Sequence, residues 1–358
     1  MRRIRVAVVY GGRSSEHGVS VVSAGSVLSA LDPERYEVVP VGITRGGGWV
    51  LTGADPEKLQ ITGRTMPEVD TGTAVVLPGD PTSQGLVVVE PGEGARALGD
   101  VDVVFPLLHG RYGEDGTIQG LLEMAGLPYV GAGVFASAAA MDKEYSKKLL
   151  RAEGIPVGDY AVVRGGEQPS AIDLEHLGLP VFVKPARAGS SIGITKVKQW
   201  SDLASALAAA FEHDDKVLVE AAVVGREVEC GVLEDDDGRP IASVPAEIRL
   251  VRGHDWYDFD AKYLDDACEF DIPAKLPAEV TATVRDLACR AFTALDCAGL
   301  ARVDFFVRGG GEVLVNELNT MPGFTPISMF PQVWAASGVD FPALIDKLIA
   351  SALRRARR

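Results

Sequence analysis

Runs of mostly hydrophobic residues alternate with segments of helical spacing along the first part of the chain. Residues 4–10 and 101–108 are apolar except for Arg5 and Asp102, as in strands that are buried on both faces of a parallel sheet. Residues 36–43 form another strand-like run. Between residues 10 and 36, the hydrophobic positions from Val21 to Leu31 recur at helical spacing. This alternation predicts a doubly wound parallel sheet, with ligand-binding loops at the carboxyl ends of the strands.

The pattern changes twice along the rest of the chain. Residues 45–99 are rich in Gly, Pro and Thr and hold only short β-type runs, so we interpret them as a loop or hairpin insertion. The composition shifts again near residue 131. The later segments predict a mixture of helices and strands, with helices at 141–153, 201–211, 278–295 and 341–358, strands at 160–163, 181–184 and 216–220, and a β-rich region over 223–320.

Length and charge narrow the class of protein. A chain of 358 residues is longer than one hydrophobic core usually supports, so several domains are expected. The net charge of −15 argues against a general nucleic-acid binder. No hydrophobic run is long enough for a membrane span, and the basic, apolar N-terminus is better interpreted as a first strand than as a signal peptide. The four cysteines form no C-x-x-C pair and fit a reducing compartment, so we expect a cytoplasmic protein.

One glycine-rich segment has the features of a phosphate-binding loop. The chain contains neither G-x-x-x-x-G-K-[ST] nor G-x-G-x-x-G, which excludes a P-loop and weakens a dinucleotide site. In LPVFVKPARAGSSIG (179–193), however, a strand delivers Lys184 and a loop of small residues follows, so that backbone N–H groups are able to face an anion. Lys143, at the start of a predicted helix, is a candidate second ligand. The alternatives are an ordinary hairpin turn and a surface lysine.

The strongest chemical signal is a set of oxygen-bearing side chains on two neighbouring strands. Asp304 lies in one predicted strand, and Glu317 and Asn319 lie two residues apart in the next, so the latter two share a face. Carboxylate and amide oxygens suit Mg²⁺, which prefers carboxylates together with substrate phosphates. The sequence therefore predicts a metal site beside the phosphate loop, the alternative being surface polar residues on an edge strand.

Polar groups around these strands are candidates for binding a reacting substrate. Arg302 and the backbone N–H of Gly323 are placed to form an oxyanion hole, and Ser328 and Lys262 to hold a carboxylate. Glu16 stands at the mouth of the first helix, where it either accepts a hydrogen bond from a ligand ammonium group or caps the helix.

The order of the motifs resembles that of one known family. The segments that carry the resemblance are GGRSSEHGVS, HGRYGEDGTIQG, MDKEYSKKLL, VKPARAGSSIG, VEAAVVGREVE, FDAKYL, LARVDFF and NELNTMPGFTPISMFP. Together they are similar to the successive motifs of D-alanine–D-alanine ligases and cover nearly the whole chain. The resemblance implies the ATP-grasp fold, in which an N-terminal α/β domain precedes two α+β domains that clamp ATP. It implies an N-terminal substrate domain (1–131, with the insertion 45–99), a central lid domain (132–222) and a C-terminal metal and catalytic domain (223–358).

The resemblance also assigns roles in binding ATP and metal. Lys143 and Lys184 would bind phosphates, with Ser190 and Ser191 in the loop that closes over them. Residues 220–223, Glu220 and Val223 among them, would line the adenine, and Glu227 would hold the ribose. Two Mg²⁺ or Mn²⁺ ions per active site would be bound by Asp304, Glu317 and Asn319.

For the amino-acid substrates, the resemblance implies that Glu16 holds the ammonium group of the first D-alanine, near His109. Glu16, Ser190 and Tyr263 would form a hydrogen-bonded triad, and Lys262 would meet the transferred phosphate. The remaining roles would be oxyanion binding by Arg302 and Gly323, and capture of the second D-alanine's carboxylate by Ser328 and Met329. A homodimer is usual in the family.

The implied reaction is the ATP-dependent joining of two D-alanines through an acyl phosphate, which supplies a peptidoglycan precursor. One alternative is a D-alanine–D-lactate ligase, against which Tyr263 argues. Another is a different ATP-grasp carboxylate–amine ligase, against which Glu16 and Ser328 argue. A non-catalytic nucleotide sensor would lack a metal ligand or Arg302, and none of these is missing.

Overall fold

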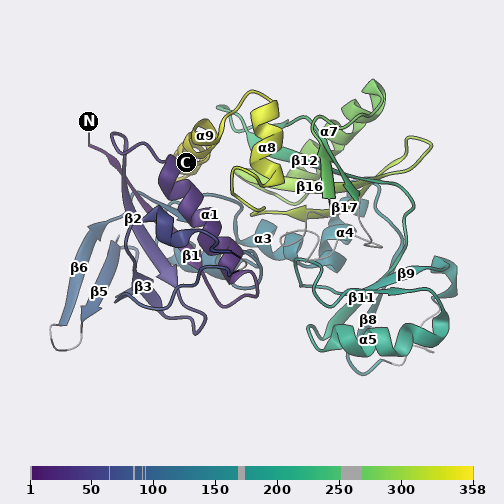
Figure 1. The fold of residues 1–358 in the computed structure, drawn as a ribbon, viewed down its shortest axis with the longest axis horizontal. Helices are drawn as coiled ribbons and strands as arrows, with labels where there is room; N and C mark the ends of the chain where they lie inside the picture. The colour runs from purple at the N-terminus through teal and green to yellow at the C-terminus, as the bar shows by residue number, and fades with distance from the viewer. Residues whose placement is uncertain are drawn as a thin grey trace.

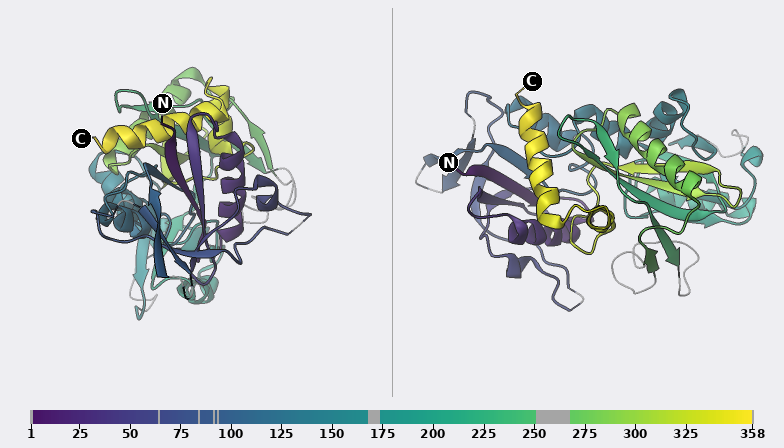
Figure 2. Two further views of the ribbon diagram at one scale, coloured as in Figure 1. Left: turned by 90° about the vertical axis from the view of Figure 1, so that its left-hand side faces the viewer. Right: turned by 90° about the horizontal axis from the view of Figure 1, so that it is seen from above.

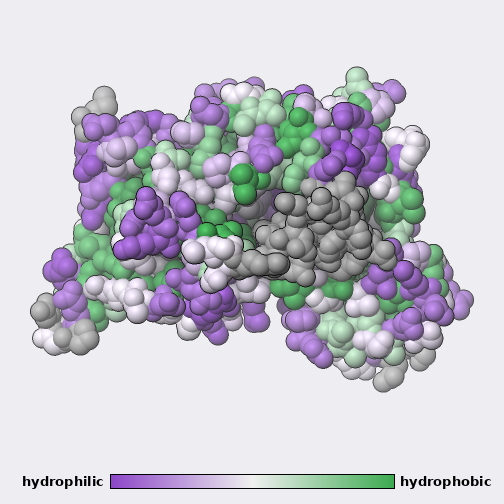
Figure 3. Space-filling model, viewed as in Figure 1, coloured by the Kyte–Doolittle hydropathy of each residue, from purple (hydrophilic) through white to green (hydrophobic). Residues whose placement is uncertain are grey.

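The computed structural model describes residues 2–63, 65–83, 85–90, 92, 94–167, 174–250 and 268–357, which form three sheets with helices packed on them (Figure 1). The space-filling view mixes hydrophilic and hydrophobic side chains over the same face (Figure 3). In the described residues, no helix has both the length and the apolar character needed to cross a membrane.

The N-terminal sheet has a parallel part and an antiparallel part. Strands β1 (Ile4–Gly11), β2 (Tyr36–Ile43) and β7 (Val103–Pro106) pair in parallel, as predicted. Helix α1 (His17–Ala30) packs on one face through Val21 and Val27, and α2 (Thr117–Met124) packs on the other. The apolar β1 and β7 are therefore buried on both faces.

The segment 45–99 is more than the predicted loop or hairpin. It adds four strands to the same sheet, in the order β6-β5-β4-β3-β2-β1-β7, and each added strand pairs antiparallel to its neighbour. The N-terminal sheet is therefore mixed rather than wholly parallel. The added strands are β3 (Trp49–Leu51), β4 (Thr73–Val76), β5 (Gly85–Glu90) and β6 (Gly94–Asp100).

The second sheet is small and antiparallel. Its order is β10-β9-β11-β8, and α5 (Leu203–Phe211) packs on it through Leu207 and Ala210. Figure 1 shows this unit in teal, apart from the N-terminal sheet. The strands are β8 (Tyr160–Arg164), β9 (Val181–Pro185), β10 (Thr195–Val197) and β11 (Lys216–Ala221).

The third sheet carries the predicted metal ligands. Its main path is β15-β14-β12-β16-β17, with β13 paired to β12, and α7 (Ala278–Ala294) covers it. Helix α8 (Met329–Ala336) follows the last strand. The strands are β12 (Arg226–Glu234), β13 (Pro240–Ala242), β14 (Ala246–Leu250), β15 (Cys268–Asp271), β16 (Leu300–Val307) and β17 (Val313–Asn319).

Several helices pack on a sheet that is distant in sequence. Helices α3 (Val134–Met141) and α4 (Lys143–Ala152) bury alanines and Leu150 against the third sheet. Helix α9 (Phe341–Arg355) returns to the N-terminal sheet, where Leu344 and Leu348 share a core with β1, and Figure 2 shows it beside those strands. The expected boundaries near 131 and 222 fall between sheets and stay a prediction.

Candidate active site

Two cavities meet at the centre of the molecule. The first, of about 520 Å³, lies between the N-terminal unit and the segment after β17, and is lined by Glu16, His109, Arg302, Asn319, Gly323, Ser328 and Met329. The second, of about 310 Å³, lies between the second and third sheets and is lined by Lys143, Lys184, Ser190, Ser191, Glu220, Val223, Glu227, Asp304 and Glu317. Lys143, Ser190 and Glu317 line both. Lys262 and Tyr263 lie outside the described residues.

The three predicted metal ligands converge on the wall between the cavities. In the β16–β17 ladder, Asp304 lies opposite Glu317, and Arg302 lies opposite Asn319. The Asn319 Nδ2 donates to Asp304 Oδ2 at 3.0 Å, and the Lys143 ammonium lies 3.6 Å from Glu317 Oε2. In the described residues, no three His, Cys, Asp or Glu side chains form a metal-binding group. Two carboxylates and one amide fit Mg²⁺ only if other oxygens complete the shell, as phosphate oxygens would.

Arg302 is held in a fixed orientation by two buried carboxylates. Its Nε and Nη2 each donate to Asp304 at 2.7 Å, and its Nε lies 3.0 Å from Glu229 Oε2. The side chains of Arg302 and Glu229 are 16% and 7% exposed. A planar guanidinium that is bound on one edge keeps its remaining donors in a defined direction. Because Arg302 also lines the first cavity, it is able to serve an anion there.

The lysines of the second cavity are paired with carboxylates. Lys184 lies 2.6 Å from Glu220, and Lys147 lies 3.4 Å from the same carboxylate. Burial alone would raise the pKa of Glu220, but the lysines outweigh it and lower the pKa. Burial lowers the pKa of Lys147. Four lysines (Lys143, Lys147, Lys184 and Lys196) and five carboxylates line this cavity. Such a mixed lining suits a polyanionic ligand that brings divalent cations to the carboxylates.

The glycine-rich loop reaches across to the first cavity. Its Ser190 hydroxyl donates to Glu16, which is one edge of the predicted triad. Glu16 precedes α1, but its side chain makes no capping hydrogen bond to that helix. Of the two alternatives for Glu16, the structure shows the one in which the carboxylate faces a cavity. Lys143 donates to the carbonyl of Ala188, so the loop also contacts the second cavity's lysine.

The buried His109 and the half-buried Glu114 hold the backbone of Met321, just before Gly323. His109 Nδ1 lies 3.0 Å from the Met321 carbonyl, and Glu114 Oε1 accepts from the Met321 N–H at 3.1 Å. Glu114 also accepts from Gly110 N–H at 2.7 Å. Burial, reinforced by the nearby charge of Glu16, raises the pKa of Glu114 to about 8. Burial lowers the pKa of His109. The turn that carries Gly323 is therefore fixed from the N-terminal unit.

The turn after Met321 forms a close-packed polar pocket. The Ser328 hydroxyl accepts from Thr325 N–H at 3.1 Å and lies 2.7 Å from the Thr325 hydroxyl. A Cβ on Gly323 would approach the Ser328 hydroxyl at 3.1 Å, which is tighter than an ordinary contact. Ser328 precedes α8 but makes no side-chain hydrogen bond to its first turn. The first amides of α8 therefore stay open to an anionic group.

Two family models match the chain. The model described as D-ala D-ala ligase N-terminus covers residues 5–132, and that described as D-ala D-ala ligase C-terminus covers residues 149–350. The D-alanine–D-alanine ligase of Nocardia farcinica is 62% identical over 357 residues, which are 99% of this chain and 98% of that protein. This chain belongs to the D-alanine–D-alanine ligase family. The D-alanine–D-alanine ligase of Mycobacterium avium is 60% identical over 361 residues, with the same coverage.

Solved structures in the D-alanine–D-alanine ligase family share the fold. The VanG D-Ala:D-Ser ligase of Enterococcus faecalis has a TM-score of 0.86 at 36% identity, with 98% of this chain and 100% of that one covered. A Bacillus anthracis D-alanine–D-alanine ligase complexed with ATP has a TM-score of 0.74 at 29% identity, with 99% of both chains covered. The predicted family and ATP-grasp fold class are confirmed.

Three charged residues of this family member were missed at the sequence level. Lys147 lies one helical turn beyond Lys143 in MDKEYSKKLL, so i, i+4 spacing would have placed both on one face. Glu229 follows Glu227 by two residues on a strand, and period-two alternation would have placed both on one face. Glu114 gave no such signal, because its partner Met321 is more than two hundred residues away.

Proposed function

We propose that this protein is an ADP-forming D-alanine–D-alanine ligase that makes a peptidoglycan precursor. The observation that carries the proposal is the shared wall of the two cavities. Glu317 and Lys143 line both, so a carboxylate in the first cavity would meet the terminal phosphate of a nucleotide in the second. Membership of the family and the names of its relatives support the same activity.

ATP would occupy the second cavity. Lys143 and Lys184 would bind its phosphates, residues 220–223 would line the adenine, and Glu227 would hold the ribose. Asp304, Glu317 and Asn319 would hold two Mg²⁺ or Mn²⁺ ions, which would offset the charge that develops on the phosphoryl oxygens. Lys184 now pairs with Glu220 at 2.6 Å, so binding of phosphate would replace one anionic partner of this lysine by another.

In the first step, Glu16 would hold the ammonium group of the first D-alanine, with His109 alongside. One carboxylate oxygen of this substrate would attack the γ-phosphorus of ATP, and the bond to the β,γ-bridging oxygen would break. The products would be ADP and an acyl phosphate. The Ser190–Glu16 hydrogen bond would close the loop over this reactive anhydride and exclude water.

In the second step, the neutral amine of the second D-alanine would attack the acyl carbon. Ser328 and the Met329 N–H would hold its carboxylate. Arg302 and the Gly323 N–H would stabilise the tetrahedral oxyanion, which then collapses and expels phosphate as one amine proton passes to the departing phosphate. The carboxylates of Asp304 and Glu229 fix the guanidinium before the reaction begins, so little reorganisation would be needed.

Three further points rest on the family resemblance. We infer a homodimer, a cytoplasmic location and the three domain roles, with substrate binding in 1–131, a lid in 132–222 and metal binding and catalysis in 223–358. Lys262 and Tyr263, outside the described residues, would meet the transferred phosphate and complete the triad with Glu16 and Ser190.

Phosphate release tests the proposed function. Purified protein with ATP and Mg²⁺ should release phosphate with D-alanine and not with L-alanine. D-Lactate and D-serine, each offered together with D-alanine, test the acceptor specificity, since a relative is named as a D-Ala:D-Ser ligase. We expect D-alanyl-D-alanine as the main product at neutral pH. Predominant formation of the ester or of the serine dipeptide would contradict the assignment.

A further inference from the structure

The phosphate loop contains two serines in an unfavourable backbone conformation. Ser190 and Ser191 have φ angles of +50° and +60°, in the left-handed region where a Cβ crowds the backbone. Non-glycine residues keep such a conformation only where the surrounding structure over-determines it. One restraint is the hydrogen bond from Ser190 to Glu16. A second restraint is needed on the other side of the pair, toward strand β9.

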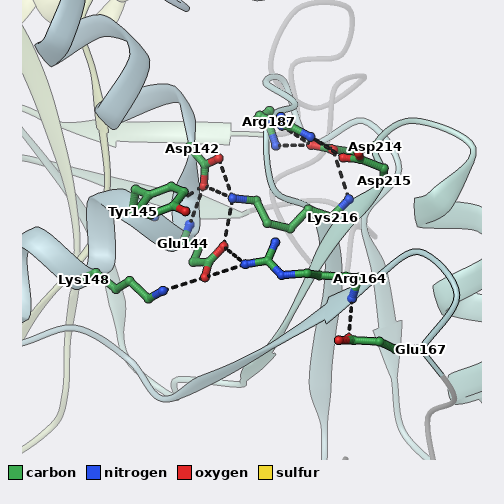
Figure 4. A network of polar contacts seen from close by, with 10 residues as sticks. All are labelled: Asp142, Glu144, Tyr145, Lys148, Arg164, Glu167, Arg187, Asp214, Asp215 and Lys216. Carbon is green, nitrogen blue, oxygen red and sulfur yellow. Dashed lines mark hydrogen bonds and ion pairs between the residues drawn. The ribbon is translucent and has the colours of Figure 1, made fainter.

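That second restraint is at Arg187, the residue that begins the loop. Its backbone N–H donates to Asp214 Oδ2 at 2.8 Å, and its Nε donates to the same oxygen at 3.0 Å. Its Nη2 donates to the other carboxylate oxygen of Asp214. Figure 4 shows the guanidinium and the carboxylate side by side. A fork of this kind fixes orientation as well as distance.

Asp214 is a buried group that ties together two segments. Its side chain is 5% exposed, and its Oδ1 also accepts from Lys216 N–H at 3.1 Å, at the start of β11. Burial alone would raise the pKa of Asp214, but these hydrogen bonds outweigh it and lower the pKa. The carboxylate is therefore charged at neutral pH and joins the first residue of the loop to the neighbouring strand.

The same residues support the lysine beneath the loop. The Lys143 N–H donates to Ala186 O at 3.0 Å, and Ala186 N–H donates to Lys216 O at 2.9 Å. The Lys216 ammonium donates to Asp142, which caps α4, and lies 2.9 Å from Glu144 (Figure 4). Residues on both sides of Lys143 are thus held by Lys216. The base of the loop and the start of α4 form one connected polar network.

We propose that Asp214 and Arg187 are positioning residues for ATP, which hold the base of the phosphate loop so that residues 188–193 and Lys143 face the triphosphate. The inference rests on the proposed function for its ligand. Neither residue lines the cavity assigned to the nucleotide, so the effect on ATP acts through the loop. Both face a separate cavity behind the loop, together with Asp142.

The test uses substitutions that remove the fork but keep the local fold. Arg187→Gln leaves both backbone N–H donors to Asp214 in place, and Asp214→Asn keeps one acceptor oxygen. Each substitution should raise the KM for ATP and the Kd for a non-hydrolysable Mg–ATP analogue by roughly tenfold. This is about the effect on affinity of losing one hydrogen bond to a charged group. The KM for D-alanine at saturating ATP should stay within about twofold. Arg187→Lys, which keeps the charge without the fork, should recover part of the loss.

The matched control is the Arg45–Glu68 ion pair. It joins the turn after β2 to the segment before β4, with Arg45 Nη2 2.8 Å from Glu68 Oε1, and it is about half exposed and lines neither the two site cavities nor the one behind the loop. Arg45→Gln and Glu68→Gln should leave both ATP constants unchanged. Folded Arg187→Gln and Asp214→Asn variants with wild-type ATP constants would overturn the proposal. The proposal would also be overturned if the variants lost affinity for ATP and for D-alanine equally and in proportion to the fall in melting temperature. That result would mean that the pair has only a structural role.

The analogue Kd separates this inference from the proposed function. If the wild-type protein binds the Mg–ATP analogue but does not join D-alanines, the proposed function fails while the role of the Arg187–Asp214 pair is still measured. If the wild-type protein binds no Mg–ATP analogue, both fail.

Discussion

Replacing Arg302 should affect catalysis and stability by separable amounts. Arg302→Ala removes one of two predicted oxyanion donors. Loss of one such donor typically costs 10²–10³ in turnover, or about 2.7–4 kcal/mol. We therefore expect kcat to fall by roughly this factor. The KM for ATP should change less than kcat, because the guanidinium reaches the cavity assigned to the nucleotide only through Asp304.

The same substitution should also lower the stability of the folded protein. Arg302 donates two 2.7 Å hydrogen bonds to Asp304 and lies 3.0 Å from Glu229, and the two carboxylate side chains are only 13% and 7% exposed. Removing one partner from a buried ion pair costs on the order of 3–5 kcal/mol, because the remaining charge lacks compensation. Arg302→Ala should therefore also lower the melting temperature by several degrees.

Arg302→Lys separates the two effects. The lysine keeps a positive charge between Asp304 and Glu229, so most of the stability should return. It lacks the planar fork, so turnover should stay at least about tenfold below wild type. Steady-state ADP release at saturating substrates, alongside thermal unfolding, measures both quantities. A folded Arg302→Ala variant with a near-normal rate would refute the oxyanion role.

Three further predictions concern the phosphates, the metal and pH. Lys184→Met should raise the KM for ATP by roughly tenfold or more in steady-state kinetics while the protein stays folded, because Lys147 still compensates Glu220; an unchanged KM would contradict the phosphate role. Chelation of Mg²⁺ should abolish ADP release without changing the circular dichroism spectrum, and continued release would contradict the metal assignment. The pKa of Glu114 is raised from 4.5 to about 8 in the folded protein. Between pH 4.5 and about 8, the carboxyl group is therefore ionised in the unfolded state but protonated in the folded state. Its contribution to the free energy of unfolding falls as the pH rises through this range. Relative to Glu114→Gln, wild type should lose up to about 1.4 kcal/mol of unfolding free energy per pH unit in urea titrations, and parallel curves would contradict this.

Local sequence patterns predicted that Asp304, Glu317 and Asn319 lie close together. Strands β16 and β17 are consecutive and joined by a short turn, so alternation within each strand was enough to place Glu317 and Asn319 beside Asp304. The glycine-rich loop follows its strand directly, and small residues identify it. In both places the relevant contacts are close in sequence, so periodicity carries the information.

Contacts that are distant in sequence were not predictable in this way. The strands of segment 45–99 are short, and their role as an extension of the N-terminal sheet depends on pairing that periodicity does not encode. Helix α3 was missed because its run of alanines has no polar face to mark a helical period. The contact of Glu114 with Met321 exists only once separate units have packed together, and that of Arg187 with Asp214 only once β9 and β11 have paired.

The most direct test of the account follows an oxygen atom through the reaction. If the D-alanine carboxylate attacks the γ-phosphorus, one of its oxygens becomes the bridge of the acyl phosphate and leaves with phosphate in the second step. D-Alanine labelled with ¹⁸O in its carboxylate should therefore yield phosphate that carries one ¹⁸O atom for each D-alanyl-D-alanine formed, as measured by mass spectrometry. Dipeptide formation with unlabelled phosphate would contradict carboxylate activation by phosphoryl transfer at this site.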